Sequence, residues 1–176
     1  MEDNAKNSNK DKKIQLGHDK LKIFFVTHLD KIYAAKAHLV QNLPSLINQI
    51  YFTDLRSAIT ETLENVEKQL ARMEIIYSIL DSEIAAGSCT GLIGLVDDAF
   101  EDINTYSADP ELRDLSIAFY MQNIESMEAS SFQVLQMAAV KMKNDQIKQL
   151  IYDNYKEAKS DRTLLLLITA KYMIAK

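Results

Sequence analysis

Apolar residues recur at helical spacing along most of the chain, with polar residues between them. The first stripe predicts a helix over residues 18–49, and the second, which is the most regular, predicts a helix over 54–84. A segment with three glycines follows, and a shorter stripe then covers 91–106. Two further stripes predict long helices over 110–142 and from 145 to the end of the chain.

Local signals support several of these boundaries. Asp109 followed by Pro110 is typical of a helix start, with the aspartate as N-cap and the proline at the first helical position. Asp54 is a candidate N-cap for the second helix. Pro44 lies inside the first helix, where it should kink the helix or weaken one hydrogen bond.

The lengths of the predicted helices suit an all-α, ferritin-like four-helix bundle. A helix of about 30 residues is about 45 Å long, and the segment 91–106 is short enough to act as the crossover between two long-helix hairpins. The sequence has only 4 glycines and 2 prolines, which also favours long helices with few breaks. Its hydrophobic content of 47% is enough for a sizeable core. We therefore predict one bundle domain over 18–176, preceded by a polar, disordered tail over 1–17 without a signal peptide.

The charge and the cysteine content limit the binding partners and the compartment that we expect for the protein. The net charge is −5, and the basic residues are spread thinly, which argues against binding to nucleic acid. The most apolar run, LLLLITAKYMIA, is too short to span a bilayer, so we expect no membrane association. The single cysteine, Cys89, fits a reducing compartment such as the cytoplasm, and we interpret it as a small loop residue rather than a nucleophile.

Lys36 is the residue that the helical pattern does not explain, because it lies inside the apolar stripe of the first helix. Two interpretations stay open: its ammonium pairs with a buried carboxylate, or its methylene stem is buried while the ammonium reaches water. The candidate carboxylates are Glu125, Glu128, Glu157 and Asp161. We interpret these four as a solvated helix face, with a core role as the alternative, since charged side chains are rarely buried unpaired.

Histidines and tyrosines have ordinary explanations in a bundle. His28 lies on the first stripe and is expected to be a hydrogen-bonded core histidine, whereas His38 should face solvent or a partner subunit. Tyr33, Tyr77 and Tyr120 are expected to be packed tyrosines with bonded hydroxyls.

Four segments together resemble a known family. They are LDKIYAAKAHLVQNLP, VEKQLARMEIIYSIL, CTGLIGLV and DPELRDLSIAFYMQNIESMEASSF. In this order they resemble segments of the YciE/YciF family of bacterial ferritin-like proteins, over about residues 21–167. The resemblance implies a ferritin-like bundle that is often dimeric, from a family associated with bacterial stress responses.

A ferritin-like di-metal site uses carboxylates from all four helices and two Glu-x-x-His pairs. This chain has no Glu-x-x-His, and its histidines, His18, His28 and His38, all precede the second helix. The resemblance implies glutamate in place of Lys36, histidine and glutamate around Thr62 and Asn65, and histidine in place of Ser126. We therefore expect no catalytic residue and no cofactor, and a buried polar centre formed by Lys36, Thr62, Asn65 and Ser126 instead of a metal. If a metal does bind, its ligands should be Glu125, Glu128, Glu157 and Asp161.

Two functions follow as expectations. The first is a non-enzymatic structural or stress-associated bundle, and the alternative is a di-iron or di-manganese carboxylate protein, oxidase or catalase-like, with an atypical ligand set. The last helix, RTLLLLITAKYMIAK, is apolar all round, which favours a homodimer interface or a surface that binds another protein. The sequence has no phosphate-binding glycine loop, nucleophile elbow or zinc-ligand cluster, so other enzyme classes find no support.

Overall fold

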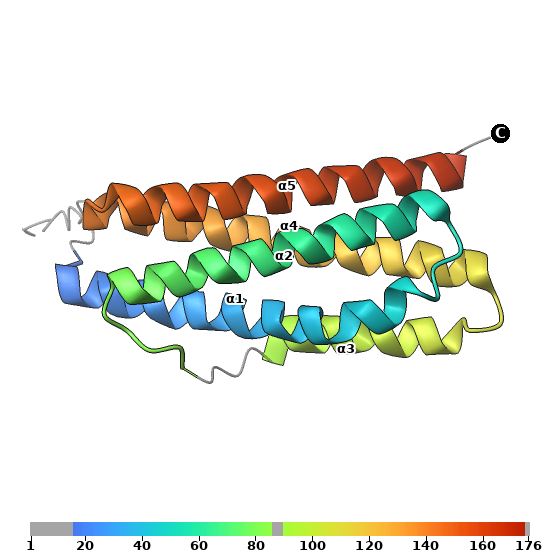
Figure 1. Cartoon of the computed structure of the whole chain (residues 1–176), viewed down its shortest axis with the longest axis horizontal. Coiled ribbons are helices and arrows are strands. Elements are labelled where there is room, and N and C mark those ends of the chain that lie inside the picture. The colour runs from blue at the N-terminus through green and yellow to red at the C-terminus, as the bar shows by residue number, and fades with distance from the viewer. Residues whose placement is uncertain (1–15, 86–89, 175–176) are drawn as a thin grey trace, which may run out of the picture.

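The computed structural model describes residues 16–85 and 90–174, and within them every regular element is a helix. The helices are α1 (His18–Ile47), α2 (Thr53–Ile79), α3 (Thr90–Thr105), α4 (Pro110–Met142) and α5 (Asp145–Ile174). Figure 1 shows the four long helices and the short α3, so the predicted all-α bundle is confirmed. Cys89 and residues 1–15 of the predicted tail lie outside the described residues.

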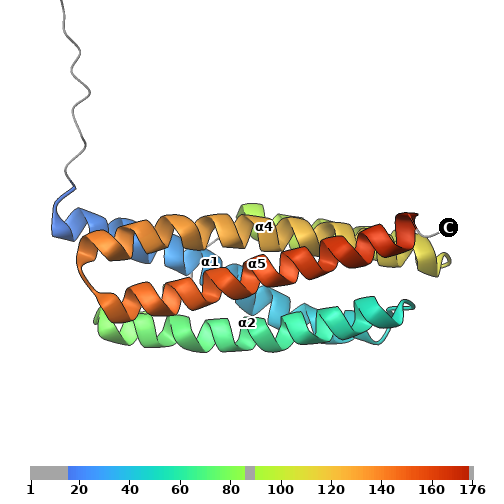
Figure 2. The ribbon, with the colours of Figure 1, turned by 90° about the horizontal axis from the view of Figure 1, so that it is seen from above.

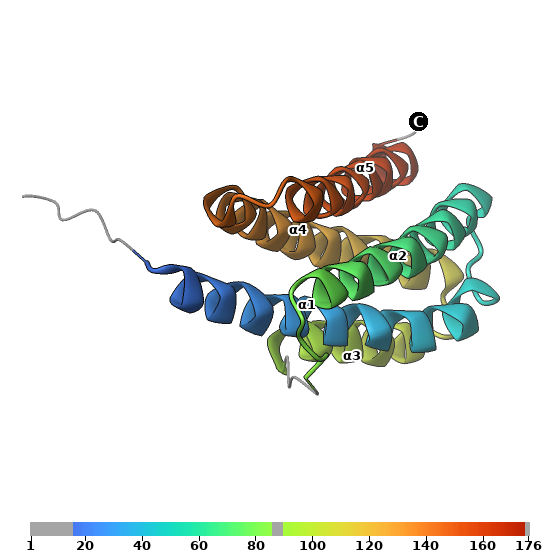
Figure 3. The same ribbon diagram turned by 60° about the vertical axis from the view of Figure 1, so that its left-hand side comes forward.

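The long helices form two antiparallel hairpins, α1 with α2 and α4 with α5 (Figures 1 and 2). α1 contacts α2 and α4, and α5 also contacts α2 and α4, so the four helices enclose one common core. α3 lies outside this ring, against α1 and α4, and connects the two hairpins (Figure 3). The predicted crossover helix therefore has the place in the fold that its length implied.

The start of α4 follows its local sequence signal. The carboxylate of Asp109 accepts a hydrogen bond from the backbone N–H of Leu112 at 3.1 Å, as an N-cap does. Asp54 is not the N-cap of α2, because Phe52 occupies that position and forms no side-chain capping bond. Another aspartate binds the backbone just before α2. Asp114 of α4 is fully buried, and its Oδ2 accepts the N–H groups of Tyr51 and Phe52 at 2.7 and 2.6 Å. A residue of α4 thus anchors the backbone that leads into α2.

α2 ends at Ile79, short of the predicted end at Ile84. Asp81 adopts a left-handed backbone conformation with φ 47°, and the N–H groups of Asp81 and Ser82 bond back to carbonyl oxygens of the last helical turn. This arrangement satisfies the final carbonyls and turns the chain out of the helix. Ile84 lies at the helical spacing of the predicted stripe, but it is exposed and does not belong to the helix.

α5 starts at Asp145, as predicted. Its carboxy-terminal half leaves large apolar side chains on the surface, among them Leu167 at 63% and Ile174 at 75% exposed. Across the residues that the structure describes, no helix has the length and apolar character needed to cross a membrane.

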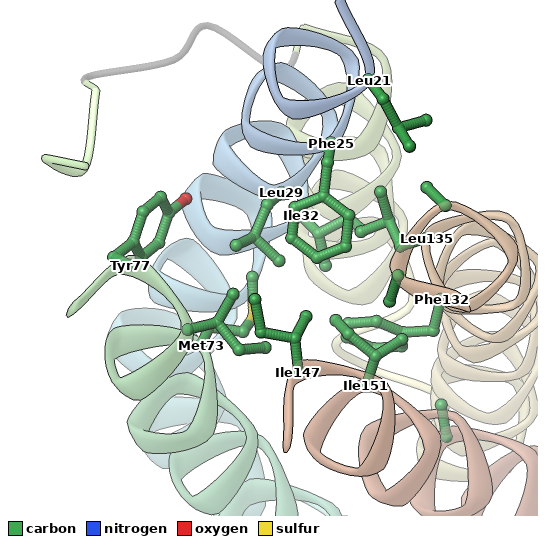
Figure 4. Packing of buried hydrophobic residues seen from close by; sticks show 14 of the residues in the cluster. Leu21, Phe25, Leu29, Ile32, Met73, Tyr77, Phe132, Leu135, Ile147 and Ile151 are labelled. Atoms are coloured by element: carbon green, nitrogen blue, oxygen red, sulfur yellow. The ribbon is translucent and has the colours of Figure 1, made fainter. Parts of the chain in front are cut away.

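The core consists of two apolar clusters, one towards each end of the bundle. The Phe25 cluster contains Leu21, Phe25, Leu29, Ile32, Met73, Ile76, Tyr77, Ala129, Phe132, Leu135, Ala138, Ala139, Ile147, Ile151 and Ala158. Figure 4 shows its side chains converging from the surrounding helices. The Leu43 cluster contains Leu39, Leu43, Leu46, Ile50, Leu55, Ala58, Ile59, Val96, Ile103, Ile117, Ala118, Met121, Ile124, Leu165 and Ile168. The candidate site lies between these two clusters.

Candidate functional site

A layer of buried polar side chains separates the two apolar clusters. The polar layer consists of Lys36 from α1, Thr62 and Gln69 from α2, Glu125 and Glu128 from α4, and Asn154 and Asp161 from α5. All seven are at most 3% exposed. In α1 the change of cluster is sharp, because Ile32 belongs to one cluster, Leu39 to the other, and Lys36 lies between them. Each of the four long helices contributes to the polar layer.

The centre of the polar layer is an ion pair between α1 and α4. Lys36 Nζ donates to Oε2 of Glu128, and both side chains are 0% exposed. The same ammonium lies 5.5 Å from the centroid of the Phe132 ring. Of the two interpretations of Lys36, the structure therefore has the buried pair and not an ammonium in water. Pairing offsets the cost of burying each charge, which would be large for either partner alone.

Glu125 lies one helical turn before Glu128 and is also fully buried. Neither of its carboxyl oxygens has a hydrogen-bond partner among the described residues. Burial raises the pKa of Glu125 well above its ordinary value, and the charge of Glu128 raises it further, while Lys36 acts in the opposite direction. The surroundings of Glu125 thus favour a neutral, protonated carboxyl group.

Asp161 extends the polar layer towards α2 and α5. Asn65 Nδ2 donates to both of its oxygens, Oδ1 at 3.1 Å and Oδ2 at 3.2 Å. Burial raises the pKa of Asp161 to about 6, although the hydrogen bond from Asn65 and the charge of Lys36 lower it. The influence of Lys36 on both Glu125 and Asp161 shows that these groups share one electrostatic environment.

An arginine closes the polar layer on the side of α2 and α5. Arg72 donates from Nη1 and Nη2 to the two oxygens of Glu157 at 2.6 and 2.7 Å, and Nη1 also donates to Asn154 Oδ1 at 3.1 Å. Asn154 Nδ2 in turn donates to the backbone carbonyl of Gln69 at 3.4 Å. This two-bond contact is half-buried, so it stands between the polar layer and solvent.

The structure corrects our interpretation of the four acidic residues. Glu125, Glu128 and Asp161 are buried, so the prediction of a solvated face is wrong for them, and Glu157 is half-buried and paired. For Glu125 and Glu128 the error arose because the apolar arc of α4 is broad and gives no clear polar side. Of the predicted polar centre, Lys36 and Thr62 are buried, whereas Asn65 and Ser126 are half-buried. Ser126 donates to the carbonyl of Gln122 in its own helix at 2.7 Å and forms no hydrogen bond with Lys36 or Glu128.

Both histidine predictions also need correction. His28 is half-buried rather than a core residue, and its ring centroid lies 4.4 Å from that of Phe24. His38 does not simply face solvent, because its Nε2 lies 2.9 Å from Oδ1 of Asp97 on α3. The tyrosines are packed as expected, with their hydroxyls donating to carboxylates; the pairs are Tyr33 with Glu74, Tyr77 with Asp30, and Tyr120 with Asp102.

Sequence reasoning missed Gln69 and Asn154. Gln69 follows Thr62 by two helical turns and precedes Met73 by one, so its spacing did place it on the buried face. The predicted stripe used the more hydrophobic Leu70 instead, which is half-buried. Asn154 has the same kind of signal, since it lies at helical spacing from the buried Ile151 and Ala158.

The donor set does not fit a pair of metal ions. Lys36 occupies one oxygen of Glu128, and its positive charge would repel a cation beside it. In residues 16–85 and 90–174, no group of three or more histidine, cysteine, aspartate or glutamate side chains is arranged to hold a metal ion. The polar layer is therefore organised around an ammonium group.

Both the sequence and the structure of the chain are similar to those of known proteins. Residues 20–173 match the family described as a domain of unknown function, DUF892. The chain belongs to this family. The DUF892 chain is similar in structure to the E. coli stress protein YciF, with a TM-score of 0.82 and 20% identity over 89% of this chain and 98% of that chain. It is also similar to YcfI, a putative structural protein from Rhodopseudomonas palustris, with a TM-score of 0.77 and 26% identity over 89% of this chain and 97% of that one.

These matches confirm the resemblance to the YciE/YciF family that the sequence segments indicated. At 20% identity, the likeness of the DUF892 chain to YciF concerns the fold alone. A search of curated proteins finds no match to the chain.

Proposed function

We propose that this chain is a non-enzymatic, ferritin-like bundle in which a lysine supplies the positive charge that metal ions provide in a di-metal protein. The observation that carries the proposal is the Lys36–Glu128 pair, fully buried at the centre of the bundle. A cation that is part of the chain needs no loading, so the fold holds its central charges together without a cofactor. The protein then acts as a structural or stress-associated scaffold and not as an oxidase.

One further observation supports this role, and a second concerns the compartment in which the protein acts. The structurally similar proteins are described as a stress protein and as a putative structural protein, and neither description names a reaction. The single cysteine of the sequence is compatible with action in a reducing compartment such as the cytoplasm.

Metal analysis tests the proposal. The protein is produced with added iron and manganese, dialysed, and its metal content is measured by elemental mass spectrometry. We expect far less than one equivalent per chain, and the same content in a Glu125→Gln/Glu128→Gln double variant, which identifies any residual metal as surface-bound. Two equivalents in the wild type that are lost in the double variant would overturn the proposal.

One observation favours the alternative of a di-iron or di-manganese carboxylate protein with an atypical ligand set. Both oxygens of Glu125 lack hydrogen-bond partners among the described residues, so they are free to accept a cation. With Glu128, Asp161 and Glu157 in the same region, this alternative has carboxylates but no histidine in the polar layer. The metal analysis above distinguishes the two functions directly.

We further propose that the chain acts as a homo-oligomer through the carboxy-terminal half of α5. Leu167 and Ile174 are 63% and 75% exposed and lie two helical turns apart on one face. Multi-angle light scattering should give a dimer for the wild type and a monomer for Leu167→Glu/Ile174→Glu. Ile23→Glu on α1 is the matched control, because Ile23 is 65% exposed but lies near the other end of the bundle. A wild-type monomer would contradict this part of the proposal.

A further inference from the structure

The groove between α1 and α4 is filled along only part of its length. Around the Leu43 cluster, α3 covers this groove and packs Val96 and Ile103 into the core. At the start of α3 the cover ends, and an open groove of about 510 Å³ continues towards the Phe25 cluster. The same pair of helices that accepts the apolar side of α3 therefore offers a second stretch, which no residue within 16–85 and 90–174 covers.

The walls of the open groove are apolar, and the ionisable side chains in its lining are basic. Phe24 and Ile32 of α1 face Met127, Val134 and Leu135 of α4 across it. The ionisable side chains among its described lining residues are His28 and Lys31, and none of the lining residues is acidic. Such an arrangement attracts a negative charge and provides apolar surface beside it.

The charge of Lys31 is available to a ligand. Lys31 is exposed, and it forms no salt bridge with any residue that the structure describes. The hydroxyls of Ser130 and Ser131, which also line the groove, donate instead to backbone carbonyls of α4 at 2.9 and 2.8 Å. The basic side chains of α1 are thus the groups in the lining that can meet an anionic head.

We propose that this groove binds a small amphipathic organic anion, with its apolar part against Met127, Val134 and Phe24 and its anionic group beside Lys31 and His28. The volume lies within the roughly 300–1,000 Å³ of typical ligand pockets, whose walls are mostly apolar with a few polar groups. This binding activity goes beyond the structural role proposed above and does not depend on the metal content.

Charge argues against two other occupants. A two-fold dimer centred on the groove would bring Lys31 of both copies together, which like-charge repulsion disfavours. The amino-terminal residues 1–15 carry four lysines and three acidic residues. Their net charge is therefore positive and does not complement the basic side chains of the groove. A separate, negatively charged molecule fits the lining better than either.

Probe binding tests the location first. The fluorescence of 1-anilinonaphthalene-8-sulfonate, an aromatic anion, is titrated with wild type, Val134→Trp and Val140→Trp. Val134 lines the groove, whereas Val140 is 54% exposed on the same helix outside it, so the two variants add the same side chain at different places. We expect the wild type and Val140→Trp to bind alike and Val134→Trp to lose binding, with equal thermal stability and near-ultraviolet circular dichroism in all three proteins.

The role of charge is tested by competition with decanoate and with 1-decanol, which share a chain length and differ in charge. Lys31→Gln should weaken displacement by decanoate about threefold, the size expected for one partly exposed charge pair, and leave displacement by decanol unchanged. Lys148→Gln, which removes an exposed lysine outside the groove, should change neither.

Three results would overturn the proposal. They are undiminished probe binding by Val134→Trp, equal effects of Lys31→Gln on decanoate and decanol, and light scattering that shows a dimer broken by Val134→Trp. The last result would make the groove an interface between two copies.

Discussion

The two apolar clusters and the polar layer between them are equally buried but are held together in different ways. In the Phe25 cluster, side chains such as Phe25 and Phe132 stabilise the fold through the area that they remove from water, about 25 cal/mol per Å². Such contacts are non-directional, and an apolar side chain of similar volume can usually be substituted for another at modest cost. In the polar layer, Lys36 depends on one atom of one partner, Glu128 Oε2. Equal burial therefore hides very different sensitivity to single changes.

The polar layer also differs from the clusters in its charge balance. Three buried carboxyl groups, from Glu125, Glu128 and Asp161, share a single buried ammonium, that of Lys36. Burial raises the pKa values of both Glu125 and Asp161, and the charge of Lys36 offsets only part of that rise. The aliphatic and phenylalanine side chains that make up most of the apolar clusters do not titrate.

Removing the ammonium should have the largest effect. Lys36→Ala leaves Glu128 buried without its partner, and we expect it to lower the free energy of unfolding by about 3–5 kcal/mol. Urea denaturation followed by circular dichroism measures this. Lys31→Ala, an exposed lysine of the same helix, is the control and should change stability by less than about 0.5 kcal/mol. Similar midpoints for the two variants would show that the pair is not critical.

Converting the polar layer into an apolar one should have the opposite sign. In the triple variant Lys36→Met/Glu125→Leu/Glu128→Leu, no buried charge remains on α1 or α4 within the layer. Replacing buried ion pairs by apolar residues of similar volume is often neutral or stabilising by about 1–4 kcal/mol. The same denaturation experiment should therefore place the triple variant at or above the wild type. Strong destabilisation would mean that the polar layer contributes stability as a unit.

The pH dependence of stability should separate the polar layer from the clusters. The pKa of Asp161 rises from 3.8 to about 6 on folding, so its stabilising contribution is complete below pH 3.8 and is lost as the pH rises through 6. Over that window the loss is on the order of 2 kcal/mol. Asp161→Asn removes the titration, so its stability relative to the wild type should improve between pH 4 and pH 8 by that amount. The stability of Glu125→Gln relative to the wild type should also improve as the pH rises. A difference in stability that stays constant with pH would argue against the predictions for both variants.

The smallest effect is expected at the edge of the polar layer. Arg72→Lys retains the charge beside Glu157 but cannot form both hydrogen bonds at once. Because this pair is half-exposed, we expect a loss of at most about 1 kcal/mol, measured by the same unfolding assay. A loss as large as that of Lys36→Ala would place Arg72 among the groups on which the centre depends.

Much of the fold was predictable from particular residues. Asp109 and Pro110 located the start of α4, and the stripe through Phe25 and Leu39 located the buried side of α1. The end of α2 was not, because the left-handed turn at Asp81 has no sequence signal comparable to glycine. In the site, Lys36 was recognised as unusual from its stripe, but the burial of Glu125 and Glu128 was not recognised.

The sequence by itself determined which residues are helical and, for most helices, which side faces inward, because helical periodicity is a property of neighbouring residues. Only the tertiary structure decided that Lys36 meets Glu128, 92 residues away, and that Glu125 is buried beside this pair with no hydrogen-bond partner in the described part of the chain. The physical reason is that such a meeting depends on how each helix is rotated and shifted against the others. Those rotations are set by the packing of all side chains at once and not by any local spacing.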